Sequence, residues 1–96
     1  MDYDGSADVV VKKTGEKVGQ CRVEIHERTA ARFEGTLFVG GRAAMHLLGQ
    51  GTLLLRLEDG RVAPCLITRA SLNELSASIV LERAPYVEDP DLPPKS

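Results

Sequence analysis

One stretch of the chain, TLLLRLEDGRVAPCLIT (residues 52–68), restricts the fold more than any other. It contains two mainly apolar runs joined by Asp59-Gly60, a dipeptide that favours a two-residue hairpin turn. Counting outward from this turn places Leu57 opposite Val62 and leaves one face of the hairpin wholly apolar. The stretch therefore predicts an antiparallel β-hairpin with one buried face.

The second face of this hairpin is mixed in character. The same count places Arg56 opposite Ala63 and Leu54 opposite Cys65, so apolar and charged side chains share that face. Pro64 has no amide donor, which a sheet tolerates mainly at an edge or a bulge. We expect this strand to be an edge at that point, where another chain can pair with it.

Other segments alternate apolar and polar residues with the period of two that indicates a half-buried strand. These segments are residues 21–27, 32–39 and 77–82, and the apolar run in residues 8–13 is expected to form an earlier strand. Gly35 falls on the apolar face of its segment, where a small residue often marks a bend or a bulge. The TGEK stretch after residue 13 is expected to connect this earlier strand to the next one as a hairpin.

The pattern as a whole predicts an all-β fold, a small antiparallel β-barrel of about six short strands with at most one or two helical turns. In a chain of 96 residues, a barrel of SH3-like or OB-like size removes exposed sheet edges. We expect a single barrel domain over residues 9–84. An acidic N-terminal tail of residues 1–8 and a proline-rich acidic C-terminal tail of residues 85–96 are expected to flank it.

The glycine-rich stretch GGRAAMHLLGQG (residues 40–51) raises the question of whether it is a phosphate-binding loop. A phosphate loop of the GxxxxGK[ST] type needs a lysine and a hydroxyl residue that this stretch lacks. We interpret it as a short strand or a single helical turn between two flexible corners. The open question is whether Met45, Leu47 and Leu48 face the core of this chain or another chain.

Charge and composition limit the class of partner. The body of the chain (residues 9–84) holds eleven basic and eight acidic side chains, which is too mild an excess to predict nucleic-acid binding. No apolar run approaches the ~18 residues of a membrane span, and the acidic first residues do not resemble a secretory signal. We expect a cytoplasmic protein with no membrane partner, in which Cys21 and Cys65 are reduced thiols.

Candidate chemical groups are sparse. The soft metal ligands His26, His46, Cys21 and Cys65 form no close pair, so we expect neither a metal site nor a cofactor. No GxSxG elbow is present, and the sequence suggests no cysteine–histidine pair or paired carboxylates for acid–base chemistry. We therefore expect the protein not to be an enzyme, with a small enzyme or accessory subunit as a second alternative.

One short motif resembles a known family. RTAAR, from Arg28 to Arg32, has the spacing of the RxxxR motif of PilZ domains, which are small barrels that bind cyclic di-GMP. The resemblance implies that Arg28 and Arg32 bind the phosphates and guanine faces of this dinucleotide. The family also has a D/N-x-S-x-x-G motif, and its nearest counterpart, RASLNE, matches only at Ser71.

The remaining expectation is association with another protein or with a second copy of the chain. Apolar residues on otherwise polar faces, together with the apolar segment 42–48, are typical of an interface. The candidate interface residues are Met45, Leu47, Leu48, Leu54, Arg56 and Cys65. We expect a non-catalytic binding or assembly module that acts through protein–protein association, with a homodimer as the commonest symmetric form. The alternative is a degenerate PilZ-like module for cyclic dinucleotides.

Overall fold

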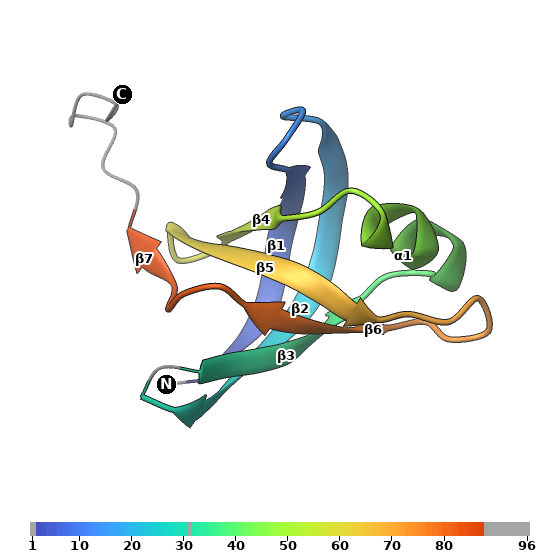
Figure 1. The fold of residues 1–96 in the computed structure, drawn as a ribbon. Helices are drawn as coiled ribbons and strands as arrows, with labels where there is room; N and C mark the ends of the chain where they lie inside the picture. The colour runs from blue at the N-terminus through green and yellow to red at the C-terminus, as the bar shows by residue number, and fades with distance from the viewer. Residues whose placement is uncertain (1, 31, 88–96) are drawn as a thin grey trace.

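The computed structural model describes residues 2–30 and 32–87, which form seven strands and one helix (Figure 1). In chain order the elements are β1 (Asp2–Val11), β2 (Lys17–Thr29), β3 (Arg32–Phe38), α1 (Gly41–Leu48), β4 (Leu53–Leu57), β5 (Arg61–Arg69), β6 (Ala77–Leu81) and β7 (Tyr86–Val87). The strands pair antiparallel in the order β4-β1-β2-β3-β6-β5, and β4 also pairs with β5. This last pairing closes a six-stranded barrel, and the short β7 adds to β5. The prediction of a small antiparallel barrel is confirmed.

The first strand begins earlier than the sequence indicated. β1 starts at Asp2 and pairs with β2 from Asp2 opposite His26 to Val10 opposite Lys17. Residues 2–8 are therefore part of the barrel and not an acidic tail. The polar residues of this stretch lie on the outer face, while Ala7 is buried. At the other end, β7 lies within the expected tail of residues 85–96, and residues 88–96 are outside the described part of the chain.

The hairpin of β4 and β5 has a register one residue away from the predicted one. Leu55 pairs with Ala63 and Leu53 pairs with Cys65, so three residues, 58–60, form the connection. Gly60 has a φ of +90°, whereas no described non-glycine residue has a positive φ, so Asp59 does not adopt the conformation of a type I′ turn. The Asp59 carboxylate instead accepts a hydrogen bond from the Arg61 amide at 3.0 Å.

This difference in register changes which side chains are buried. A one-residue slip moves every side chain of a strand to the opposite face. Cys65, predicted on the mixed face, is fully buried, and Leu66, predicted on the apolar face, is 37% exposed. Leu54 and Arg56 remain on the outer face, as predicted.

Pro64 lies in a strand that has neighbours on both sides. β5 pairs with β4 on one side and with β6 on the other, so the strand as a whole is not an edge. The last pair of the β6 ladder is Leu81 with Cys65, and the Glu82 amide then donates to the Pro64 carbonyl at 2.9 Å. The proline therefore lies where the ladder ends, and its missing donor leaves no gap within the paired region.

The barrel interior is apolar in the described residues. Its fully buried side chains come from every strand of the barrel and from α1, and no described polar or charged residue is buried. The largest are Ile25, Leu37, Leu47, Leu53, Leu55 and Ile79. The only helix of the described ranges is α1, and no helix there is long and apolar enough to span a membrane.

The backbones of β2 and β3 approach closely at Gly35. Gly35 pairs with Ile25, and a Cβ atom at Gly35 would overlap the Glu24 carbonyl oxygen. Any side chain at this position would therefore push the two strands apart. The glycine that the sequence placed on the apolar face marks a close approach of two backbones.

The two cysteines should differ strongly in reactivity. Burial raises the pKa of Cys65 to about 12, and it also raises the pKa of Cys21, which is only partly buried. At pH 8 we expect Ellman's reagent to modify one thiol per folded chain and both thiols in denaturant. Two thiols reacting at one rate in the folded protein would contradict the burial of Cys65.

The same burial predicts how stability depends on pH. The ordinary pKa of a cysteine thiol is 9.0, and the folded protein holds the Cys65 proton up to about pH 12. The unfolded chain therefore releases this proton first, and the free energy of unfolding should fall as the pH rises from 9 toward 12. Urea titrations at pH 8 and pH 10 measure this loss, which Cys65→Ala should reduce.

Candidate functional site

The apolar segment 42–48, which the sequence indicated as part of an interface, lies in α1. This helix has Ala44 and Leu47 buried against the barrel, at 0% and 1% exposure. It follows Gly40 and ends before Gly49, and the Gln50 amide donates to the Leu47 carbonyl at 3.0 Å. The segment is therefore a two-turn helix fixed by its buried face.

One flank of α1 faces the connection between β5 and β6. A Cβ atom at Gly41 would overlap the Ser71 carbonyl oxygen, so the first turn packs directly on residues 71 and 72. Helix positions 41, 45 and 48 lie on the same flank, since they are separated by four and three residues. Met45 and Leu48 thus continue the flank whose first position touches this connection.

Four large apolar side chains are exposed on α1 and on the β5–β6 connection. These two segments lie at the same end of the barrel (Figure 1). Met45 and Leu48 are each 42% exposed, and Leu72 and Leu75 are 67% and 80% exposed. We refer to these four residues as the apolar end. The sequence analysis missed Leu72 and Leu75, although two leucines three residues apart in a polar connection are an available signal.

The other candidate interface residues do not join this surface. Leu47 and Cys65 belong to the core, with 1% and 0% exposure, and are not available to a partner in this fold. Leu54 is half-buried and Arg56 is exposed on the outer face of β4. There they line a hollow of about 450 Å³ together with Val10.

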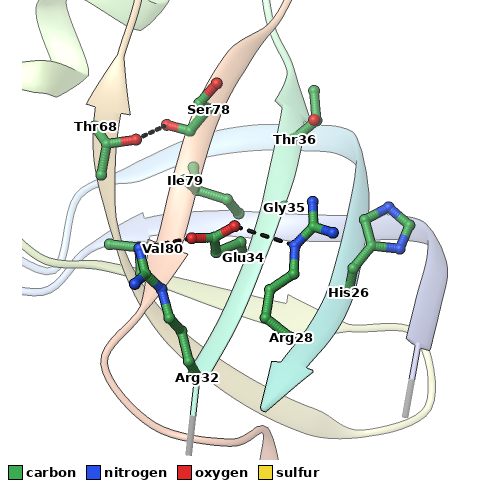
Figure 2. Close-up of a pocket in the computed structure, with 10 residues that line it drawn as sticks. All are labelled: His26, Arg28, Arg32, Glu34, Gly35, Thr36, Thr68, Ser78, Ile79 and Val80. Atoms are coloured by element: carbon green, nitrogen blue, oxygen red, sulfur yellow. Dashed lines mark hydrogen bonds and ion pairs between the residues drawn. The ribbon is translucent and has the colours of Figure 1, made fainter.

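The two arginines of the RTAAR motif line a separate pocket. It has a volume of about 410 Å³ and lies on the outer face of β2, β3, β5 and β6. Arg28 Nε lies 3.2 Å from Glu34 Oε2, and Arg32 Nη2 lies 2.7 Å from Glu34 Oε1. Figure 2 shows the Glu34 carboxylate between the two guanidinium groups.

The remaining lining of this pocket is largely polar. Thr36, Thr68 and Ser78 contribute hydroxyl groups, and Thr68 Oγ1 donates to the Ser78 carbonyl at 3.3 Å (Figure 2). His26 lies at the side, with Nδ1 4.0 Å from a carboxylate oxygen of Asp2. The sequence analysis missed the hydroxyl residues because only the strand register brings them to the arginines.

The structure separates the two parts of the PilZ resemblance. Arg28 and Arg32 line one pocket, but Ser71, the only matching residue of RASLNE, is not among its lining residues. Ser71 instead contacts Gly41 at the apolar end. The arginines are therefore brought together without the second motif of that family.

Two electrostatic features lie outside both surfaces. A hydrogen bond from Arg22 lowers the pKa of Asp4, and hydrogen bonds from Arg61 lower the pKa of Asp59. The Arg22–Asp4 pair is exposed and the Arg61–Asp59 pair is partly exposed, so each adds little to stability. Within residues 2–30 and 32–87, no group of three His, Cys, Asp or Glu side chains is arranged to hold a metal ion.

Comparison of the chain with family models, curated proteins and solved structures found no match.

Proposed function

We propose that this chain is a non-catalytic assembly module that forms a homodimer through its apolar end. The observation that carries the proposal is the exposure of Met45, Leu48, Leu72 and Leu75 at one end of an otherwise well-packed barrel. Clustered apolar side chains on a small domain are typical of a protein interface. The proposed function assigns a catalytic role to no residue.

The distribution of exposed apolar residues supports this assignment of the surface. The described residues have six exposed large apolar side chains, and four of them belong to the apolar end. The other two, Leu66 and Val87, lie on β5 and β7. Single exposed residues of this kind are ordinary, whereas a group of four on adjoining segments needs a partner.

A second copy of the chain suits the shape and charge of this surface. It combines a helix flank with a projecting connection, so a two-fold axis sets the helix of one copy against the connection of the other. Arg42 lies on α1 and Glu74 on the connection, which gives the two segments opposite charges. The contact between the helix of one copy and the connection of the other is then made twice, once on each side of the two-fold axis.

Sedimentation equilibrium tests the proposal. We expect the weight-average mass to rise from 10.4 kDa toward twice that value as concentration increases. A surface of four side chains is at the weak end of interfaces, so the dissociation constant should be on the order of 100 μM. A mass that stays at that of one chain up to millimolar concentration would overturn the proposal.

A further inference from the structure

The hollow beside Leu54 and Arg56 lies on the outer face of β1 and β4, next to the turn that joins β1 to β2. None of the four residues of the apolar end lines it, so the proposed dimer does not require it. Its volume of about 450 Å³ is within the range of small-molecule sites. The side chains around it indicate the chemical class of such a molecule.

The floor of this hollow is apolar. Val10 points away from the core because its neighbours Val9 and Val11 point into it. Val10 pairs with Leu54 of β4, so these two side chains lie next to each other on the outer face. Val10 is 9% exposed and Leu54 is half-buried. An apolar part of a ligand would be stabilised by covering the surface that they leave open.

A β-bulge places a lysine beside this floor. The pairing of β1 with β2 shifts by one residue after Val9, so that Val10 is opposite Lys17. Val18 is the extra residue of β2, and Gly19 beside it has a φ of +135°, a conformation that favours glycine. In a regular pairing Val10 would be opposite Val18. The bulge therefore sets Lys17 on the outer face next to Val10, and bulges of this kind often redirect a side chain toward a site.

A second lysine, Lys12, lines the hollow from the turn between β1 and β2. Its backbone amide donates to the Thr52 carbonyl at 3.1 Å, which fixes this part of the turn relative to the start of β4. Lys12 and Lys17 are both exposed, so a ligand in the hollow can reach their ammonium groups. Each ammonium group is a compact positive charge with three N–H donors.

The order of groups along β1 gives the hollow two different ends. Asp8, Val10 and Lys12 all line it, and they follow one another at intervals of two residues. At the far end from the turn, Asp8 is opposite Arg56 of β4. The Asp8 carboxylate disfavours a second anionic group at that end, whereas the lysines attract one at the turn. A ligand with one anionic end and an apolar body suits this order.

We propose that this hollow binds a small amphipathic carboxylate, with its anionic group at Lys12 and Lys17 and its apolar chain over Val10 and Leu54. The ammonium groups donate to the carboxylate oxygens. The aliphatic stems of the two lysines add apolar surface at the sides of the chain. The carboxylate and the chain therefore both contribute to binding, and each contribution can be removed separately.

Titration with sodium octanoate at constant ionic strength, followed by amide chemical shifts, tests the proposal. A ligand of roughly ten non-hydrogen atoms should bind with a dissociation constant on the order of a few millimolar. The shifts should saturate, and they should be largest in residues 8–12, 15–17 and 53–56. Acetate has the carboxylate without the chain, so it should bind at least tenfold more weakly than octanoate.

Lys17→Gln and Leu54→Thr should each weaken octanoate binding at least threefold, because one removes a cation and the other removes part of the apolar floor. Lys13→Gln is the matched control. Lys13 is an exposed lysine of the same turn that does not line the hollow, so its loss should leave the dissociation constant unchanged. Both lysine variants should fold like the unmodified chain, because the side chains they replace are exposed.

Three results would overturn the proposal. One is a loss of affinity in Lys13→Gln equal to that in Lys17→Gln, which would indicate attraction to net charge alone. Another is equal affinity for acetate and octanoate, which would exclude a contribution from the apolar floor. The third is a set of shifts that does not saturate, or that is confined to residues 45–48 and 72–75. Octanoate would then bind nowhere specific or at the apolar end.

None of these results depends on the oligomeric state. The titration uses protein at concentrations below the expected dissociation constant of the dimer. A monomeric protein that binds octanoate through Lys17 would support the hollow as a binding site and refute the dimer. A dimeric protein that does not bind octanoate would do the reverse.

Discussion

Gly35→Ala should lower the free energy of unfolding by about 2–3 kcal/mol, the cost typical of forcing extra volume into a closely packed site. The added Cβ atom would overlap the Glu24 carbonyl oxygen, which belongs to the paired backbone of β2 and cannot rotate away. Relief requires that β2 and β3 separate, and this disturbs the barrel on both sides. For a domain of this size, the melting temperature should fall by roughly 10–20 °C.

Gly49→Ala provides the control for this substitution. Gly49 has a φ of −85°, and its nearest neighbouring atom, the His46 carbonyl oxygen, would lie 3.9 Å from an added Cβ. Alanine fits there without strain, so the change should be within about 1 kcal/mol and stabilising, through the unfolded chain. Equal melting temperatures for Gly35→Ala and the unmodified chain would show that the two strands do not approach as described.

The double substitution Leu72→Ser and Leu75→Ser should weaken the dimer at least tenfold. Burial of a leucine side chain contributes about 1.5–3 kcal/mol, and these two are the most exposed side chains of the apolar end, at 67% and 80%. Even part of this contribution exceeds the ~1.4 kcal/mol that corresponds to a tenfold change in dissociation constant. Sedimentation equilibrium of the variant beside the unmodified chain measures the difference.

The stability of the monomer should be unaffected by this double substitution, because exposed side chains contribute little to folding. Val87→Ser is the matched control. Val87 is 71% exposed but lies on β7, away from α1 (Figure 1). It should leave the dissociation constant unchanged. A loss of dimer in this control as large as in the leucine variant would refute the assignment of the interface.

Much of the fold follows from alternation along the strands. The period of two placed Val23 and Ile25 on one face of their strand, and both are fully buried. The same reasoning held for β6, where Ala77 and Ile79 are buried. Alternate side chains of a strand point to opposite faces of the sheet, and only one face is buried. The buried face is therefore visible in the sequence of a single strand, without knowledge of its partner strands.

The hairpin register could not be obtained in this way. Asp59-Gly60 is compatible with a two-residue turn or with part of a three-residue loop, and only the two-residue type I′ turn requires a positive φ at Asp59, which the structure does not have. The hydrogen bond between the Arg61 amide and the Asp59 carboxylate favours the longer loop. Closure of the barrel then decides which face of β5 is buried, and this is a property of all six strands together.

The candidate surfaces were predicted only in part. Met45 and Leu48 were identified because they lie in an apolar segment between glycines. Their exposure and the proximity of Leu72 depend on how α1 packs against the β5–β6 connection. For the pocket, the spacing of Arg28 and Arg32 drew attention to the motif, but the contribution of β6 follows from strand pairing alone.

The central claim is that two copies of the chain associate through the apolar end, and amide chemical shifts recorded over a dilution series test it most directly. The account predicts that the signals of residues 45–48 and 72–75 shift with concentration, while those of residues 34–36 in the pocket stay constant. Signals that do not change at any residue up to millimolar concentration, or changes confined to other parts of the barrel, would contradict it.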